Sequence, residues 1–177
     1  FKTIFTLIYS AGLRMSEAVN FKLEDIDFNR KMIFVRNCKN KKDRYTLLVQ
    51  ETILLLTQYI SMYRPQNDVF RSSDVMGKIS TSCIQRQFKK LIQKNDLDQS
   101  IHVHTLRHCF ATHLLENGTS IFNIMHLLGH SNIQTTMIYL HMQSLDKLNL
   151  RSPIDFYKLS FSQNKTTGQQ DLFMESA

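Results

Sequence analysis

The feature that most constrains the fold of this chain is a double change in the spacing of its apolar residues. They recur at helical spacing at the start, alternate in the next section, and return to helical spacing for the rest. The alternating section holds three short β-type runs, Ile26–Phe28, Met32–Arg36 and Tyr45–Val49, separated by the polar turns NRK and NCKNKKD. This order predicts an α+β fold, mainly α, in which a small three-stranded antiparallel sheet interrupts a series of helices.

Helix-start and helix-stop residues predict helical segments on both sides of this sheet. They are residues 1–12, a short helix capped by Ser16, residues 51–63, a helix beginning at Ser80 or Thr81, His104–Asn117, residues 120–128, and Ile133–His141 with Asn132 as its cap. Gly12, Gly118 and Gly129 each follow a segment, where a glycine commonly ends a helix in the left-handed conformation.

Length and composition fit one globular domain with its own core, because the chain has 177 residues of which 42% are hydrophobic. We assign that domain to residues 1–158, and assign residues 159–177, a polar run with Gly, Ser and Gln, to a flexible C-terminal tail. The chain begins with Phe1 in the middle of a helical pattern, so we expect it to be an N-terminally truncated part of a longer protein.

Charge and cysteine content narrow the class of partner and the compartment. The formal net charge of +7 favours a polyanion, most commonly nucleic acid, although many basic domains carry such a charge only for solubility. Cys38, Cys83 and Cys109 form no CxxC pair, which argues against a disulfide framework or a zinc ribbon and favours the reducing cytoplasm. No apolar run approaches the ~18 residues of a membrane span, so we expect no membrane partner.

The stretch HTLRHCFATHLLENG, which begins at His104, allows either a metal site or an anion site. His104 and His108 have the spacing of two metal ligands on a helix. The zinc motif HExxH, however, needs a glutamate where Thr105 stands, and Arg107 would place a positive charge beside the ion. An anion fits better, because a guanidinium and an imidazole one turn apart can bind phosphate oxygens and move a proton. We therefore expect an anion site and no metal.

Three further stretches carry candidate residues for such a site. GLRMSE places Arg14 between two helices, LLGHS places His130 at a helix boundary, and MIYLH places Tyr139 on the final helix. Together with HTLRHCFATHLLENG, they resemble the active-site motifs of the tyrosine recombinase (phage integrase) family, closest to its Xer-type and integron-integrase branches. CKNKKDR resembles the β-hairpin lysine motif of the same family. The resemblance covers residues 1–157, and these motifs occur in the family's order with compatible gaps.

The resemblance implies a site-specific recombinase or integrase that cuts and rejoins double-stranded DNA, in integration, excision or inversion. In such an enzyme Arg14 and Arg107 clamp the scissile phosphate and offset the charge of the transition state. Tyr139 attacks phosphorus and forms a 3′-phosphotyrosyl bond, which a new 5′-hydroxyl later reverses. Because this bond stores the energy of the broken phosphodiester, the resemblance implies that ATP, metal and other cofactors are not needed.

Other side chains receive supporting roles from the resemblance. His104 serves in proton transfer to or from the nucleophile, and His130 hydrogen-bonds the phosphate. Glu17, three residues after Arg14, orients the side chain of that arginine or of His104 and does not itself contact the phosphate. His108 receives no role, and we expect it to be a packed or hydrogen-bonded helix residue.

The general acid that protonates the leaving 5′ oxygen is expected in the lysine-rich hairpin. We favour Lys39, because the KxxKxR frame that ends at Arg44 matches it. Lys41 and Lys42 are the alternatives, since the hairpin has no glycines and matching Lys39 requires one extra residue upstream. The gap between the two arginine motifs leaves no room for the helical insertion of integron integrases, so a general integrase or Xer-like enzyme is favoured.

The resemblance also implies the partners. A homotetramer of the full-length protein acts on double-stranded DNA at specific recombination sites, where an upstream helical domain closes a clamp that this chain lacks. The chain itself should be monomeric, bind DNA weakly, and lie in a prokaryotic cytoplasm, on the nucleoid when bound. Contacts with DNA phosphates are expected from Lys41, Lys42, Arg44, Arg86, Lys89, Lys90 and Lys94. For the basic stripe of Arg86, Lys90 and Lys94, the alternative is a merely solvated face.

Two other functions would use the same residues or the same fold. A type IB topoisomerase-like enzyme shares the chemistry but relaxes DNA as a monomer, without exchange between two sites. A non-catalytic DNA-binding protein would keep its function after Tyr139→Phe. The full set of candidate catalytic side chains argues against this second alternative.

Overall fold

The structure is a computed structural model that describes residues 1–36, 43–72 and 77–140. All of them belong to one compact unit, Phe1–Ser144. The expected domain end at residue 158 and the expected tail lie outside the described residues. In chain order the elements are α1 (Lys2–Ala11), α2 (Met15–Val19), the 3-10 helix η1 (Leu23–Asp25), β1 (Ile26–Asp27), β2 (Met32–Val35), β3 (Arg44–Leu47), α3 (Gln50–Tyr63), α4 (Thr81–Lys94), α5 (Val103–Glu116), α6 (Ile121–Leu128) and α7 (Gln134–Met137).

The sheet has the strand order β1-β2-β3, and both neighbouring pairs are antiparallel. Ile26 lies opposite Ile33 in the first pair, and Val35 lies opposite Arg44 in the second. The predicted strands are all present, with ends that differ by one or two residues. Several helices and this one small sheet confirm the predicted α+β, mainly α fold.

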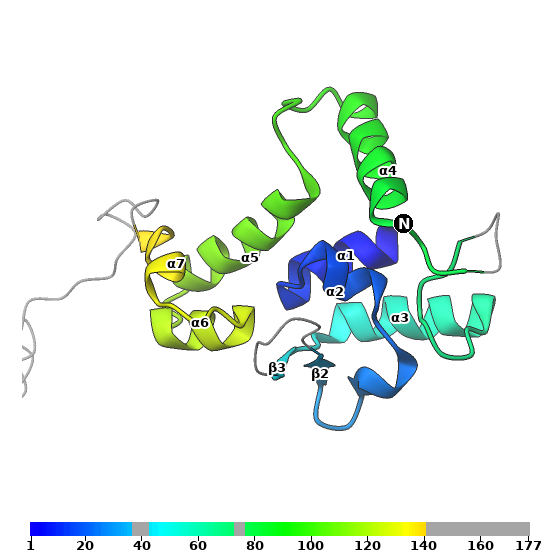
Figure 1. The fold of residues 1–177 in the computed structure, drawn as a ribbon, viewed down its shortest axis with the longest axis horizontal. Helices are drawn as coiled ribbons and strands as arrows, with labels where there is room; N and C mark the ends of the chain where they lie inside the picture. Colours follow the sequence, from blue (N-terminus) through cyan, green and yellow to red (C-terminus); the bar gives the residue numbers. More distant parts are fainter. Residues whose placement is uncertain (37–42, 73–76, 141–177) are drawn as a thin grey trace, which may run out of the picture. The chain divides into compact units, whose positions relative to one another are not determined.

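Helix α1 lies at the centre of the unit, between α3 and α5, and contacts both of them (Figure 1). Its residues Ile4, Leu7 and Ile8 are buried in a hydrophobic cluster that extends to the sheet and to α4. A second cluster lies along α5 and α6 and includes Phe110 and Leu128. Burial of one apolar face in this way is the main source of stability for helices of this length. None of the described helices is long and apolar enough to span a membrane.

The start of α2 differs from the prediction that Ser16 caps this helix. Arg14 is the N-cap residue, and its backbone N–H donates to the carboxylate of Glu17 over 2.7 Å. Ser16 lies inside the helix and is exposed. Because the glutamate in the first turn satisfies the leading backbone donor, a serine cap is not needed, and the same bond fixes the Glu17 side chain.

Helix α7 is shorter than predicted. Asn132 Oδ1 accepts a hydrogen bond from the backbone at the start of the helix (2.9 Å), as expected of a cap, but the helix ends at Met137. Tyr139 therefore lies in the turn after the helix and not on it, with its N–H bonded to the Thr136 carbonyl (3.1 Å). The predicted end, His141, lies outside the described residues. The β-branched residues of this stretch favour a helix only weakly, and the Tyr139 ring is buried instead, with 2% exposed.

The tight joint after α1 gives a prediction about stability. We expect Gly12→Ala to lower the free energy of unfolding by about 2–4 kcal/mol. Gly12 has a φ of +61°, and an added Cβ would overlap the Phe110 ring and lie 3.1 Å from Cδ2 of Leu128. Urea unfolding of the protein measures the loss.

Gly118→Ala is the matched control, because Gly118 also has a positive φ, +81°, but has nothing within 4 Å of the added Cβ. It should cost only the backbone strain of about 1–2 kcal/mol. Equal losses from the two substitutions would show that the contact with Phe110 contributes nothing.

Candidate active site

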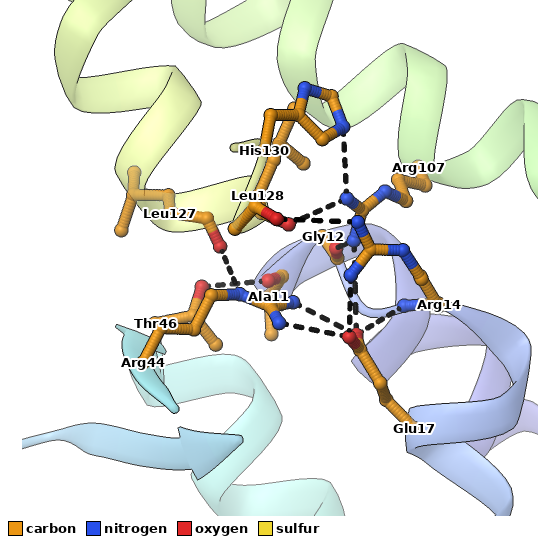
Figure 2. A network of polar contacts seen from close by, with 11 residues as sticks. Ala11, Gly12, Arg14, Glu17, Arg44, Thr46, Arg107, Leu127, Leu128 and His130 are labelled. Atoms are coloured by element: carbon orange, nitrogen blue, oxygen red, sulfur yellow. Dashed lines mark hydrogen bonds and ion pairs between the residues drawn. The ribbon is translucent and has the colours of Figure 1, made fainter. Parts of the chain in front are cut away.

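The carboxylate of Glu17 binds the side chains of several arginines where α2, β3 and α5 meet (Figure 2). Its Oε1 accepts hydrogen bonds from Nη1 of Arg14 and Nη1 of Arg44, each over 2.8 Å. Its Oε2 accepts one from Nη2 of Arg44, also over 2.8 Å, and lies 3.8 Å from Nη1 of Arg107. Burial raises the pKa of Glu17, but the hydrogen bonds and charges of the arginines outweigh it, and the pKa falls to about 2. Glu17 is therefore ionised at neutral pH.

Arg14 stands at the turn between α1 and α2, where Gly12 ends α1 in the left-handed conformation. Its Nη2 donates to the Gly129 carbonyl over 3.4 Å, which links the start of α2 to the end of α6. The Arg14 side chain is 27% exposed. Because a guanidinium carries five N–H donors and part of this one faces solvent, Arg14 can bind an anion while it stays paired with Glu17.

Arg107, on α5, is held by the ends of two other helices (Figure 2). Its Nη1 donates to the carbonyl of Gly12, after α1, and its Nη2 donates to the carbonyl of Leu128, at the end of α6, over 2.7 Å. The residue is 1% exposed. Burial, together with the charge of Arg14, lowers the pKa of Arg107 to about 9, so the side chain keeps its charge at neutral pH.

His130 follows α6 and connects Arg107 to α7. Its Nε2 lies 3.2 Å from Nη2 of Arg107, and its Nδ1 lies 2.9 Å from Oγ1 of Thr136. Because arginine can only donate, Nε2 is the acceptor in the contact with Arg107, and Nδ1 faces the threonine hydroxyl. Thr136 is fully buried, so this contact fixes the orientation of the imidazole.

Tyr139 contacts α5 through His108. The Tyr139 hydroxyl oxygen lies 3.0 Å from Nδ1 of His108. His104, one turn earlier on α5, meets the His108 ring edge to face, with ring centroids 4.5 Å apart. Burial lowers the pKa of both histidines and raises the pKa of Tyr139, which the charge of Arg107 partly offsets. The two imidazoles and the phenol are therefore all neutral at neutral pH.

The structure brings most of the sequence-predicted site residues together. The side chains that meet between α2, α5, α6 and the turn after α7 are those of Arg14, Glu17, His104, Arg107, His130 and Tyr139. Lys39, Lys41 and Lys42 lie outside the described residues. On α4, the predicted DNA-contacting residues Arg86, Lys89, Lys90 and Lys94 are all exposed. In the described part of the chain, no three His, Cys, Asp or Glu side chains are grouped closely enough to hold a metal ion.

Arg44, one of the predicted DNA contacts, is largely buried in this structure. It is 8% exposed, its Nε donates to the Leu127 carbonyl over 2.8 Å, and both of its Nη atoms are paired with Glu17. It points inward from β3 together with Thr46, whose hydroxyl donates to the Ala11 carbonyl over 2.7 Å. Arg44 therefore joins β3 to α2 and α6 in this structure, and its predicted contact with DNA stays a prediction.

Sequence reasoning missed the partners of two site residues. Thr136 holds His130, and nothing in the local pattern singles out this threonine. His108 holds Tyr139, and the only signal was the four-residue spacing of His104 and His108, which puts both on one face of a helix. That spacing says nothing about a tyrosine 31 residues away.

Comparison with known proteins identifies the family of the chain. Residues 1–145 match the model of the phage integrase family, and the chain belongs to this family. It is 37% identical over 150 residues to the tyrosine recombinase of Thermosipho africanus (strain TCF52B), a match that covers 84% of this chain and 52% of that protein. It is 30% identical to XerA recombinase, whose crystal structure matches with a TM-score of 0.74 over 89% of this chain and 57% of that one.

The fold is also shared with a more distant recombinase. XerH, solved in a pre-cleavage complex with its difH substrate, is 20% identical and matches with a TM-score of 0.68 over 92% of this chain and 46% of that one. These similarities confirm the predicted tyrosine recombinase family and its fold. The chain spans about half the length of the relatives that it matches.

Proposed function

We propose that the protein containing this chain is a site-specific DNA recombinase, and that residues 1–158 form its catalytic domain. It cuts and rejoins double-stranded DNA through a 3′-phosphotyrosyl intermediate and needs neither metal nor ATP. The observation that carries the proposal is the meeting of Arg14, Arg107 and His130 with the buried Tyr139 in one place. Fixed positive donors beside a tyrosine are what transfer of a phosphoryl group to that tyrosine requires.

Each side chain has a defined part in the proposed reaction. Arg14 and Arg107 bind the non-bridging oxygens of the scissile phosphate, and their pairing with Glu17 keeps both charges in place before DNA arrives. His130 adds a hydrogen bond to the phosphate, for which its Nε2 must carry a proton and leave its contact with Arg107. Tyr139 attacks phosphorus, His104 takes part in the transfer of the proton of this nucleophile, and Lys39 protonates the 5′ oxygen that leaves.

The proposed partner is double-stranded DNA with specific sites, on which the full-length protein acts as a homotetramer. Support comes from family membership and from XerH, a protein of the same fold that is bound to its difH substrate. The excess of positive charge on the chain fits the same partner.

The test is to incubate the full-length protein with DNA from its source, denature it in detergent, and sequence the DNA that stays covalently attached. Adducts at one defined sequence are the expected result. Adducts scattered over many sequences, together with relaxation of supercoiled plasmid, would favour a topoisomerase. Absence of adducts from an otherwise folded, DNA-binding protein would overturn the proposed reaction.

The exposed basic stripe on α4 gives a second prediction. We expect the double variant Lys90→Glu, Lys94→Glu to flatten the dependence of log Kd on log salt concentration by about 2, because each lost phosphate contact removes about 0.9 from the slope. Fluorescence anisotropy with a labelled duplex at several salt concentrations measures this slope.

A double variant with the same change in charge serves as the control for the stripe. Arg30 and Lys31 are exposed in the turn between β1 and β2, outside the proposed contact surface. Arg30→Glu, Lys31→Glu should leave the slope nearly unchanged. If the α4 variant also leaves it unchanged, the stripe is a solvated face and does not contact DNA.

A further inference from the structure

Thr136, on α7, contacts both His130 and Tyr139, although the proposed reaction gives it no part. Its Oγ1 lies 2.9 Å from Nδ1 of His130, and its backbone carbonyl accepts the N–H of Tyr139 over 3.1 Å. Thr136 is fully buried, whereas Thr135 beside it is exposed. A buried hydroxyl costs free energy unless it is hydrogen-bonded, so the contact with the imidazole offsets the cost of burying this one.

The proposed reaction requires two different proton positions on the His130 ring. A neutral imidazole has one N–H group and one nitrogen with a lone pair. When Nε2 accepts from Arg107, 3.2 Å away, a neutral ring carries its proton on Nδ1. When Nε2 donates to a phosphate oxygen, the proton is on Nε2, and the lone pair of the neutral ring is on Nδ1.

The hydroxyl of Thr136 can serve both forms of this ring. It accepts from an N–H at Nδ1, and after a turn about its Cβ–Oγ1 bond it donates to a lone pair there. A carboxylate or a carbonyl in this place could only accept, and a backbone N–H could only donate. With the hydroxyl, Nδ1 keeps its partner in both forms, and the ring keeps one orientation with Nε2 toward Arg107.

We propose that Thr136 is a positioning residue, whose hydroxyl holds the His130 ring in place while the ring proton moves from Nδ1 to Nε2. The inference rests on the proposed recombinase function and deepens it. Before DNA binds, Nδ1 donates to Oγ1 and Nε2 accepts from Arg107. When the scissile phosphate binds, Nδ1 gives its proton to water, and Nε2 takes one from water and donates to a phosphate oxygen. The Thr136 hydroxyl then donates to Nδ1.

The side chain of Thr136 can be changed without removing its contact with Tyr139. That contact uses the backbone carbonyl, which every residue has, whereas the contact with His130 uses the hydroxyl. Valine has the branched shape of threonine but no hydroxyl, and serine has the hydroxyl without the methyl group. Thr136→Val and Thr136→Ser therefore separate the hydrogen bond from the packing of the side chain.

The first test measures covalent adduct formation by the full-length protein on a nicked suicide duplex that carries the site recovered from wild-type adducts. We expect Thr136→Val to lower the maximal rate by about 10-fold, which is less than the ~10²–10³ that loss of a phosphate donor itself costs. The duplex concentration at half-maximal rate should stay nearly unchanged, because the proposed phosphate contacts of the two arginines remain. Thr136→Ser should recover most of the rate.

A double-mutant cycle shows whether Thr136 acts through His130. His130→Ala removes the imidazole, so the hydroxyl then has no ring to orient. In this background Thr136→Val should slow the reaction by less than about 2-fold further. A residue that supported only the fold would cause the same loss in both backgrounds.

The proton positions are measured by NMR on the full-length Tyr139→Phe protein with 15N-labelled histidine, which should bind the duplex without cutting it. The chemical shift of a ring nitrogen shows whether it carries a proton. The signals of His130 are those that disappear when His130→Ala is added. We expect the proton on Nδ1 in the free protein and on Nε2 in the complex with the duplex.

Thr135→Val is the matched control, because Thr135 is the exposed neighbour of Thr136 in the same helix. It removes the same hydroxyl group from the same type of residue, but one that faces solvent. This variant should keep the wild-type rate.

Several results would overturn the role of Thr136. They are a wild-type rate in Thr136→Val, an equal loss in Thr136→Ser, an undiminished loss in the His130→Ala background, and a proton that stays on Nδ1 in the complex. Failure of the recombinase proposal looks different, because the wild-type protein would then form no adduct that depends on Tyr139. The signals of His130 in the free protein would still shift in Thr136→Val.

Discussion

Tyr139→Phe is expected to lower covalent adduct formation by about 10³-fold or more, to the background of the assay. Phenylalanine fills the same buried space but has no oxygen to attack phosphorus, and Arg14, Arg107 and His130 keep their contacts. The variant should still bind DNA, since the proposed phosphate contacts come from the arginines. Recovery of covalently bound DNA after detergent treatment, for both proteins in parallel, measures the effect.

Loss of folding cannot explain this result if the variant is checked for stability. Removing the hydroxyl breaks one hydrogen bond, to His108, which should cost about 1 kcal/mol in urea unfolding. Tyr45→Phe is the matched control, because Tyr45 lies on β3 with 53% of the residue exposed, and this variant should form adducts at the wild-type rate. Equal adduct yields from Tyr139→Phe and the wild type would assign the nucleophile to another residue.

Glu17→Gln is expected to have the largest effect on stability, a loss of about 3–5 kcal/mol in the free energy of unfolding at neutral pH. The glutamine has nearly the same shape, but it removes the one negative charge shared by Arg14, Arg44 and Arg107. Among the described residues no other carboxylate pairs with Arg44 or Arg107, so both would become buried cations that lack this counter-charge. Urea unfolding measures the loss.

A surface glutamate shows what the same substitution costs without burial. Glu24 pairs with Lys22 and Arg36, but 57% of its side chain is exposed. Glu24→Gln should cost less than about 1 kcal/mol. If Glu17→Gln costs no more than this control, the carboxylate does not hold the arginines together.

The pH dependence of stability follows from the same carboxylate. The pKa of Glu17 is about 2 in the folded protein, below its ordinary value of 4.5. A lowered pKa means that the ionised form stabilises the fold, so its contribution is complete above about pH 4.5 and is lost as the pH falls toward 2. A shift of this size corresponds to about 3 kcal/mol. This part of the acid destabilisation should be absent in Glu17→Gln.

The order of elements and the ends of most helices followed from local sequence patterns. The three strands lie within one or two residues of the predicted bounds. The helix breaks at Gly12, Gly118 and Gly129 and the start of α4 at Thr81, after its cap Ser80, are where the sequence predicted them. These features depend on backbone geometry and on neighbours within one or two turns. The motif residues of the site were also identified from the sequence, through a family resemblance, although their catalytic roles are still predictions.

Local sequence patterns could not predict which side chains of β3 face inward. Tyr45 and Leu47 are the apolar residues of this strand, yet they are exposed, while Arg44 and Thr46 point inward. The reason is that Arg44 pairs with Glu17, 27 residues away, and with a carbonyl of α6, 83 residues away. A strand with a buried cation can face inward only where the fold supplies a counter-charge and carbonyl acceptors.

The sequence by itself determined which elements form, in which order, and which residue types can bind and exchange a phosphate. Only the tertiary structure decided that one carboxylate serves Arg14, Arg44 and Arg107, and that Tyr139 leaves its helix to meet His108. The physical reason is that hydrophobic spacing and helix caps act over a few residues, whereas the energy of a buried charge or a buried hydroxyl depends on partners that only the folded chain brings within hydrogen-bond distance.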